Sequence, residues 1–169
     1  RPSNYYRKIN IVFSFLCLVS ALWILNALFI FVSRDSGWKL FWIRMVFGTA
    51  SFIPGLFLHF SLIFPNYRHS LSLIKTFLIY FPAIFLSSTC QTGLIVKSIV
   101  QKEPLVLDYG ITHLFFSIYL PLYFAAGLYF LSQAYRKSTG IYRLQIIYCF
   151  MGMLITSLAA LITNILLPS

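Results

Sequence analysis

The chain has 169 residues, of which 60% are hydrophobic and 9% are charged, and its formal net charge is +10. Soluble domains average about 25% charged residues, so this composition excludes an ordinary soluble domain and indicates a protein of the lipid bilayer. The positive charge does not indicate nucleic acid as a partner. The Lys and Arg residues stand in small groups between apolar stretches and form no long basic tract.

Five apolar stretches are each long enough to cross the hydrocarbon core, which requires about 20 residues in a helix. Their apolarity is continuous and does not alternate with a period of two, so they predict helices and exclude porin-like strands. The predicted spans cover residues 10–32, 40–64, 73–96, 109–135 and 145–167. We therefore predict an all-α, polytopic helical membrane bundle with five transmembrane helices, forming a single domain over residues 1–169.

Basic residues gather in alternate loops between these spans. The side that holds the N-terminus carries Arg1, Arg7, Lys8, Arg68, Lys75, Arg136, Lys137 and Arg143, and the other side carries Arg34, Lys39, Lys97 and Lys102. All of the acids, Asp35, Glu103 and Asp108, lie on the second side. Short loops rich in Lys and Arg stay in the cytosol, so we expect a cytosolic N-terminus and, after five spans, a C-terminus outside.

The second predicted span carries a narrow stripe of small and polar residues. Arg44, Gly48, Ser51, Gly55 and His59 recur at the helical spacing of 100° per residue. Small residues let helices approach closely in lipid, and polar residues seek partners away from lipid. We therefore expect this stripe to face the interior of the bundle, where packing alone would also explain it.

Prolines lie well inside three of the predicted spans, at Pro54, Pro82 and Pro121. Proline removes a backbone donor and bends a helix, so three bent helices could shift against one another when a ligand binds. Membrane helices also tolerate prolines as static kinks, which is the simpler interpretation.

Polar residues from five different spans are expected in the outer half of the membrane: Asn26, Arg44, Gln91, His113 and Asn164. Ionisable residues inside a membrane are functional candidates, and a small-ligand site needs convergent polar groups in an apolar cavity. We expect an outward-facing pocket for a small or lipid-like ligand here. The alternatives are packing alone and, for Arg44, snorkelling to the outer interface beside Trp38 and Trp42.

No catalytic constellation is visible in the sequence. It contains no Gly-rich phosphate loop, GxSxG, HExxH or paired carboxylates, and every acid lies in a predicted outer loop. The three histidines lie at three different depths, and the three cysteines lack CxxC spacing. We therefore expect no enzymatic activity, no metal site and no cofactor.

The second span and the far end of the chain resemble a known family. The span reads WKLFWIR at residues 38–44 and FLHFSLIFP at 57–65, and it follows Ala21-Leu22-Trp23 and Asn26. The far end reads YRKSTG at 135–140, RLQ at 143–145 and NILLP at 164–168. Both stretches are similar to the N-terminal seven-helix membrane sensor region of bacterial histidine kinases and related signalling proteins, and together they cover about half of the chain.

This resemblance implies that the span at 10–32 is the second helix of such a region and runs from the cytosol outward. The loop charges indicate the same orientation. The resemblance also implies one further span before Arg1 and one after Ser169, with a cytosolic kinase or other output domain beyond it. The implied location is the bacterial cytoplasmic (inner) membrane.

We therefore predict a non-catalytic sensory module that couples an envelope or membrane stimulus to a cytosolic output domain. Its expected partners are the lipid bilayer, a small or lipid-like ligand, the output domain and a second copy of the chain. One alternative is a small transporter component, which requires a polar path across both leaflets. Another is a structural subunit of a membrane complex, without a cavity near Arg44 and His113.

Overall fold

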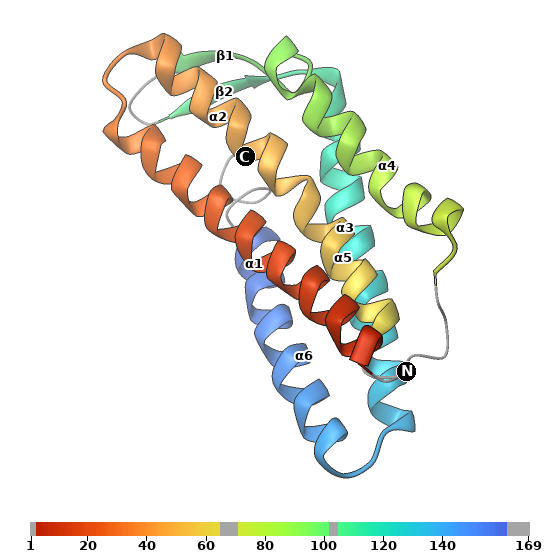
Figure 1. The fold of residues 1–169 in the computed structure, drawn as a ribbon. Coiled ribbons are helices and arrows are strands. Elements are labelled where there is room, and N and C mark those ends of the chain that lie inside the picture. The colour runs from red at the N-terminus through yellow and green to blue at the C-terminus, as the bar shows by residue number, and fades with distance from the viewer. Residues whose placement is uncertain (1–2, 65–70, 102–104, 162–169) are drawn as a thin grey trace.

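The computed structural model describes residues 3–64, 71–101 and 105–161. These residues are mostly helical, and a short hairpin lies across one end of the helices (Figure 1). The elements are α1 (Ser3–Val32), α2 (Ser36–Ala50), α3 (Phe52–Ile63), α4 (Leu73–Thr89), the 3-10 helix η1 (Cys90–Thr92), β1 (Val96–Gln101), β2 (Val106–Tyr109), α5 (Ile111–Lys137) and α6 (Gly140–Leu161).

Within the described residues, four helical segments are long and apolar enough to cross a membrane. They are Arg7–Val32, Ser36–Ile63, Leu73–Thr92 and Ile111–Lys137, and a shorter apolar helix covers Gly140–Ile155. The first four predicted spans thus correspond to long apolar helices. The count of five spans and the orientation of the two termini stay predictions.

The expectation of an all-α chain is wrong at one end of the bundle, where β1 and β2 pair as an antiparallel hairpin. The predicted third span, 73–96, is too long, because α4 ends at Thr89 and Val96 begins β1. Gly93 explains the end of the helix, since its φ of 81° is left-handed and stops helical propagation. The predicted fourth span also begins too early, because Tyr109 belongs to β2 and α5 starts at Ile111.

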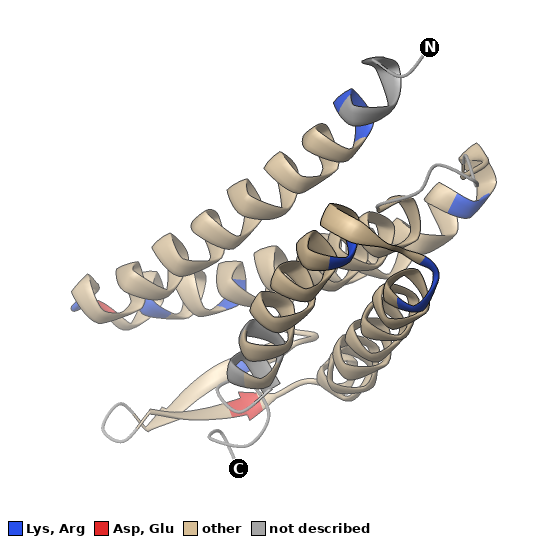
Figure 2. Cartoon of the chain, turned by 90° about the horizontal axis from the view of Figure 1, so that it is seen from below, with Lys and Arg blue, Asp and Glu red and all other residues tan. Residues whose placement is uncertain are grey.

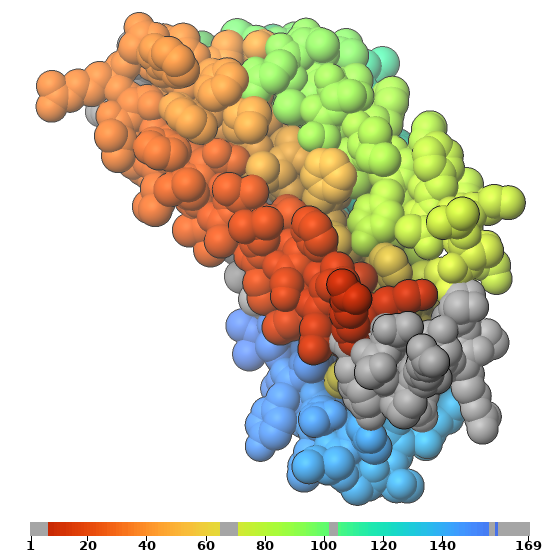
Figure 3. All heavy atoms as spheres, in the orientation of Figure 1, coloured from red at the N-terminus to blue at the C-terminus, as the bar shows by residue number. Residues whose placement is uncertain are grey.

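The centre of the bundle is the continuous path of α2 and α3. In the space-filling view, α1 lies over this path with α4 on one side and α6 on the other (Figure 3). Phe57 is 0% exposed, and a Cβ added to Gly127 of α5 would lie 2.6 Å from its ring. The helices α3 and α5 therefore approach so closely at this point that only glycine fits at position 127.

The stripe on this central path does face other helices, as predicted. A Cβ added at Gly48 would lie 2.9 Å from Sγ of Cys90, and one at Gly55 would lie 3.4 Å from the hydroxyl of Tyr119. His59 shares a hydrogen bond of 2.9 Å with the hydroxyl of Tyr80 on α4. The opposite faces of α2 and α3 are covered as well, so the path is enclosed on several sides.

At Ser51, between α2 and α3, the φ of −60° and ψ of −30° stay helical, and only the regular helical hydrogen-bond pattern is interrupted. Pro54 lacks the N–H that would bond to the carbonyl four residues earlier, so a break in this turn is expected. The hydroxyl of Tyr119 on α5 donates a hydrogen bond of 2.9 Å to the backbone oxygen of Ser51. By contrast, α4 and α5 continue through Pro82 and Pro121 without interruption.

Candidate functional site: a clamp at the hairpin end

The side chain of Arg44, on α2, binds η1 and the beginning of β1, on either side of the turn between them. Its Nε donates to the carbonyl of Val96 at 3.0 Å, its Nη1 to that of Gln91 at 3.1 Å and its Nη2 to that of Lys97 at 2.9 Å. All of these acceptors are backbone oxygens. A single guanidinium therefore connects α2 to a segment about 50 residues further along the chain. It can do so because the planar guanidinium holds several N–H donors in a fixed geometry.

The position of this turn explains why a cation is stable there. Carbonyls at the C-terminal end of a helix have no intrahelical partner and carry partial negative charge. Of the three acceptors, Gln91 belongs to η1, so this contact places the guanidinium at the negative end of the helical segment, whereas Val96 and Lys97 belong to β1. A Cβ added at Gly93 would lie 3.2 Å from Nη2 of Arg44, so the turn passes close to the guanidinium.

The same turn also caps α5. The N–H of Thr112 donates to the carbonyl of Leu94 at 3.1 Å, and that of Gly110 donates to Ile95 at 2.9 Å. A Cβ at position 110 would lie 2.0 Å from the oxygen of Leu94, so this approach requires glycine. The segment that Arg44 holds therefore also accepts hydrogen bonds from the N–H groups of Gly110 and Thr112, at the beginning of α5.

Aromatic side chains close the space beneath the hairpin. The ring of His113 stacks on Tyr109 with a centroid distance of 3.9 Å, and both rings meet the edge of Phe47 on α2, at 5.8 and 6.3 Å. Ile95 and Val96 are 0% exposed beside them. We call Arg44, Phe47, Tyr109 and His113 the hairpin clamp.

The predicted polar cluster is only partly assembled. Arg44 and Gln91 meet, since Gln91 offers its carbonyl to Arg44 and its amide lies 3.5 Å from the oxygen of Phe41. Asn26 instead donates to Thr49 at 3.3 Å and joins α1 to α2. His113 contacts aromatic rings, and its Nε2 is covered without a hydrogen-bond partner in the described part of the chain. Asn164 lies outside the described residues, and the ligand-binding role of these residues stays a prediction.

Sequence reasoning missed Phe47 and Tyr109 as members of the clamp, and it missed the acceptors of Arg44. Backbone carbonyls carry no side-chain signal, so no motif could identify them. The two glycines at 93 and 110, which flank a run rich in Val and Ile, are the signal that could have indicated a hairpin.

The chain matches, over residues 4–168, the family described as the N-terminal 7TM region of histidine kinase, and it therefore belongs to that family. The resemblance noted in the sequence is thereby confirmed. Membership makes the chain a membrane sensor region of the histidine kinase type. Neither a curated protein nor a solved structure gave a match in the same comparisons.

Replacing Arg44 with Lys should loosen the hairpin, because a single ammonium cannot reproduce the fork that reaches three carbonyls. Losing charge-assisted hydrogen bonds worth about 1.5 kcal/mol or more should raise amide hydrogen exchange in residues 95–101 about tenfold. Mass spectrometry of the chain in nanodiscs measures this exchange.

The matched control is Lys97→Gln, which removes only the exposed ion pair of 3.7 Å between Lys97 and Asp108. Exposed pairs contribute about 1 kcal/mol or less, so exchange should rise about fivefold at most. Equal exchange in the Arg44→Lys variant and the unchanged chain would show that the clamp does not hold the hairpin.

Proposed function

We propose that the chain is the non-catalytic sensory part of a histidine kinase-like receptor and couples an envelope or membrane stimulus to a cytosolic output domain. The observation that carries this proposal is the family match across residues 4–168. The hairpin clamp supports it, because it gives one end of the bundle a defined contact through which a local displacement reaches the central helix.

The proposed signal passes from the hairpin through Arg44 to α2 and α3. A change at the hairpin moves the turn that Arg44 holds, and α2 moves with it. The interruption at Ser51 then allows α2 and α3 to change their relative angle, with the Tyr119 hydrogen bond fixing one arrangement. The output is an equilibrium between two bundle arrangements, which a stimulus shifts by favouring one of them.

We further propose that the hairpin end lies outside the cell and that the protein is a multi-pass protein of the bacterial cytoplasmic membrane. The described acids, Asp35 before α2 and Asp108 in β2, belong to the hairpin end, whereas Lys and Arg occur at both ends (Figure 2). Arg136 and Lys137 end α5 at the opposite end. The described Lys and Arg residues outside the spans are more numerous at the end with the N-terminus (Arg7, Lys8, Lys75, Arg136, Lys137 and Arg143) than at the hairpin end (Arg34, Lys39 and Lys97), which supports a cytosolic N-terminus under the positive-inside rule.

We propose three further partners for a chain in this orientation. A small or lipid-like ligand would reach Asn26, Arg44, Gln91 and His113 from outside. A kinase or other output domain would act in the cytosol, and a second copy of the chain would complete a dimer. These partners are proposals that rest on family membership.

Cysteine labelling tests the orientation. In a chain whose native cysteines are replaced by alanine, Ser98→Cys on β1 should react with a membrane-impermeant maleimide in intact cells. Thr139→Cys, in the turn between α5 and α6, should react only after permeabilisation. The reverse pattern would overturn the orientation.

Phosphorylation tests the sensory function. The full-length product of the gene that encodes this chain should incorporate phosphate from radiolabelled ATP on a histidine when reconstituted in nanodiscs. Arg44→Met should change that incorporation by up to about fivefold, because losing about 1 kcal/mol from one of two states shifts their ratio by about that factor. Lys97→Gln is the control and should change it less than Arg44→Met does. No histidine phosphorylation, or no effect of Arg44→Met, would contradict the proposal.

A further inference from the structure

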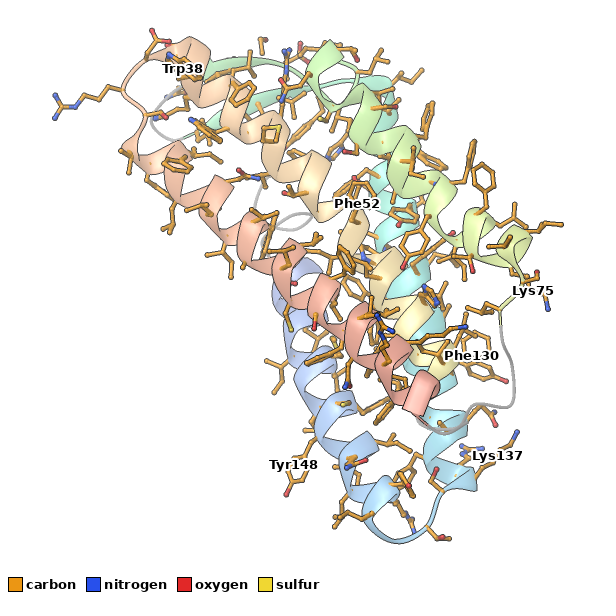
Figure 4. All side chains as sticks on the ribbon, viewed as in Figure 1. Trp38, Phe52, Lys75, Phe130, Lys137 and Tyr148 are labelled. Carbon is orange, nitrogen blue, oxygen red and sulfur yellow. The ribbon has the colours of Figure 1, made fainter. Side chains whose placement is uncertain are left out.

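An apolar cleft of about 550 Å³ lies between α1 and α6, away from the hairpin clamp. It forms because α1 packs mainly on α2 and α3, whereas α6 packs mainly on α5. Ala50 and Ile53 of the central path and Leu120 and Phe124 of α5 form its floor. Tyr148 marks its edge and projects from α6 on the side turned away from α5 (Figure 4).

The cleft lies at the middle of the proposed membrane. Its α1 wall runs from Phe13 to Ile24, near the centre of the apolar segment Arg7–Val32. Its described lining contains no Lys, Arg, His, Asp or Glu. Burying an ion without a partner is costly, so this lining suits only an uncharged occupant.

Two hydrogen-bond donors on α1 lie in this wall, one helical turn apart, at Ser20 and Trp23. The hydroxyls of Ser51 and Ser61 donate to carbonyls four residues earlier, at 2.8 Å in both cases. Ser20 makes no such bond among the described residues, and its side chain lines the cleft. The indole nitrogen of Trp23 is covered and also lacks a partner there. Water is scarce in the hydrocarbon core, so an acceptor atom on an occupant of the cleft would satisfy this hydroxyl.

We propose that this cleft binds an uncharged, lipid-like molecule with a carbonyl oxygen, which accepts a hydrogen bond from Ser20 while its aliphatic part fills the cleft. The volume lies within the range of about 300–1,000 Å³ that is typical of small-molecule sites. The ligand enters sideways from the bilayer. This inference rests on the proposed sensory function, since an occupant that separates α1 from α6 favours one bundle arrangement over the other.

A phospholipid cannot supply this oxygen without distorting the bilayer. Its ester carbonyls lie at the interface, about 15 Å from the middle of the hydrocarbon core. A carbonyl at the depth of Ser20 therefore belongs to a free lipophilic molecule dissolved in the membrane. An acyl chain from a bilayer lipid could fill the same volume but would leave Ser20 unpaired.

The test is photolabelling of the full chain in phosphatidylcholine nanodiscs with dodecan-2-one that carries a diazirine on its chain. We expect saturable labelling within residues 13–24 and 148–153, mapped by mass spectrometry. Unlabelled dodecan-2-one should compete at least about threefold better than dodecane, since a neutral hydrogen bond contributes about 1 kcal/mol.

Two variants and a matched control locate the site. Ser20→Ala should weaken saturable labelling about threefold to tenfold, by removing the donor. A side chain at Gly152 enters open space, with no atom within 4 Å of its Cβ, so Gly152→Phe should fill the cleft and reduce labelling at least about tenfold. Met151→Phe adds the same ring at an exposed neighbour outside the lining and should change nothing. Circular dichroism and size-exclusion chromatography verify that each variant is folded.

Labelling that rises linearly with the probe and survives Gly152→Phe would overturn the site. A second outcome is saturable labelling that dodecane and dodecan-2-one reduce equally and that Ser20→Ala does not change. It would show that the ligand needs no carbonyl oxygen and that acyl chains occupy the cleft. The sensory function is tested separately by histidine phosphorylation. Loss of phosphorylation with intact labelling would refute the function and leave the site standing.

Discussion

The guanidinium of Arg44 is the contact on which the hairpin end of this molecule depends. A cation near a membrane interior is stabilised when its donors are paired, and here the backbone carbonyls of residues 91, 96 and 97 each accept a hydrogen bond from the guanidinium. In return, the N–H groups of Arg44 provide hydrogen-bond donors for carbonyls that have no partner within a helix. The guanidinium and the backbone carbonyls therefore stabilise each other. The turn between η1 and β1 leads into the hairpin and also caps α5.

Two parts of the bundle differ in how firmly they are held. Close contacts at glycines hold the central path of α2 and α3 to α4 and α5, and the hairpin clamp fixes its end. In contrast, α1 and α6 border the cleft lined by Ser20, whose hydroxyl has no partner among the described residues. A sensor requires a part that changes with its ligand and a part that transmits the change. The cleft and the clamp fit these roles at different depths.

The sequence predicted the helices and the inward stripe well, because both follow from side-chain pattern. Arg44, Gly48 and Gly55 are spaced so that they share one helix face, and small and polar residues in lipid favour helix contacts. The hairpin could not be predicted in the same way, because Ile95 and Val96 continue the apolar run of α4 and are equally suited to a span. Its position depends on a left-handed glycine and on carbonyls that accept from Arg44, and a hydropathy pattern contains neither. The cleft depends on the splay of α1 and α6, which is a property of packing.

A designed disulfide tests most directly whether Arg44 holds this end together. A Cβ at position 48 would lie 2.9 Å from Sγ and 3.5 Å from Cβ of Cys90, close to the separations that disulfides require. In a chain with Cys17 and Cys149 replaced by alanine, Gly48→Cys should therefore join to Cys90 in most molecules on mild oxidation, as a mass measurement would report. Adding Arg44→Met should slow that reaction at least about fivefold, because about 1 kcal/mol of restraint on η1 is lost. An unchanged rate would contradict the central role assigned to Arg44.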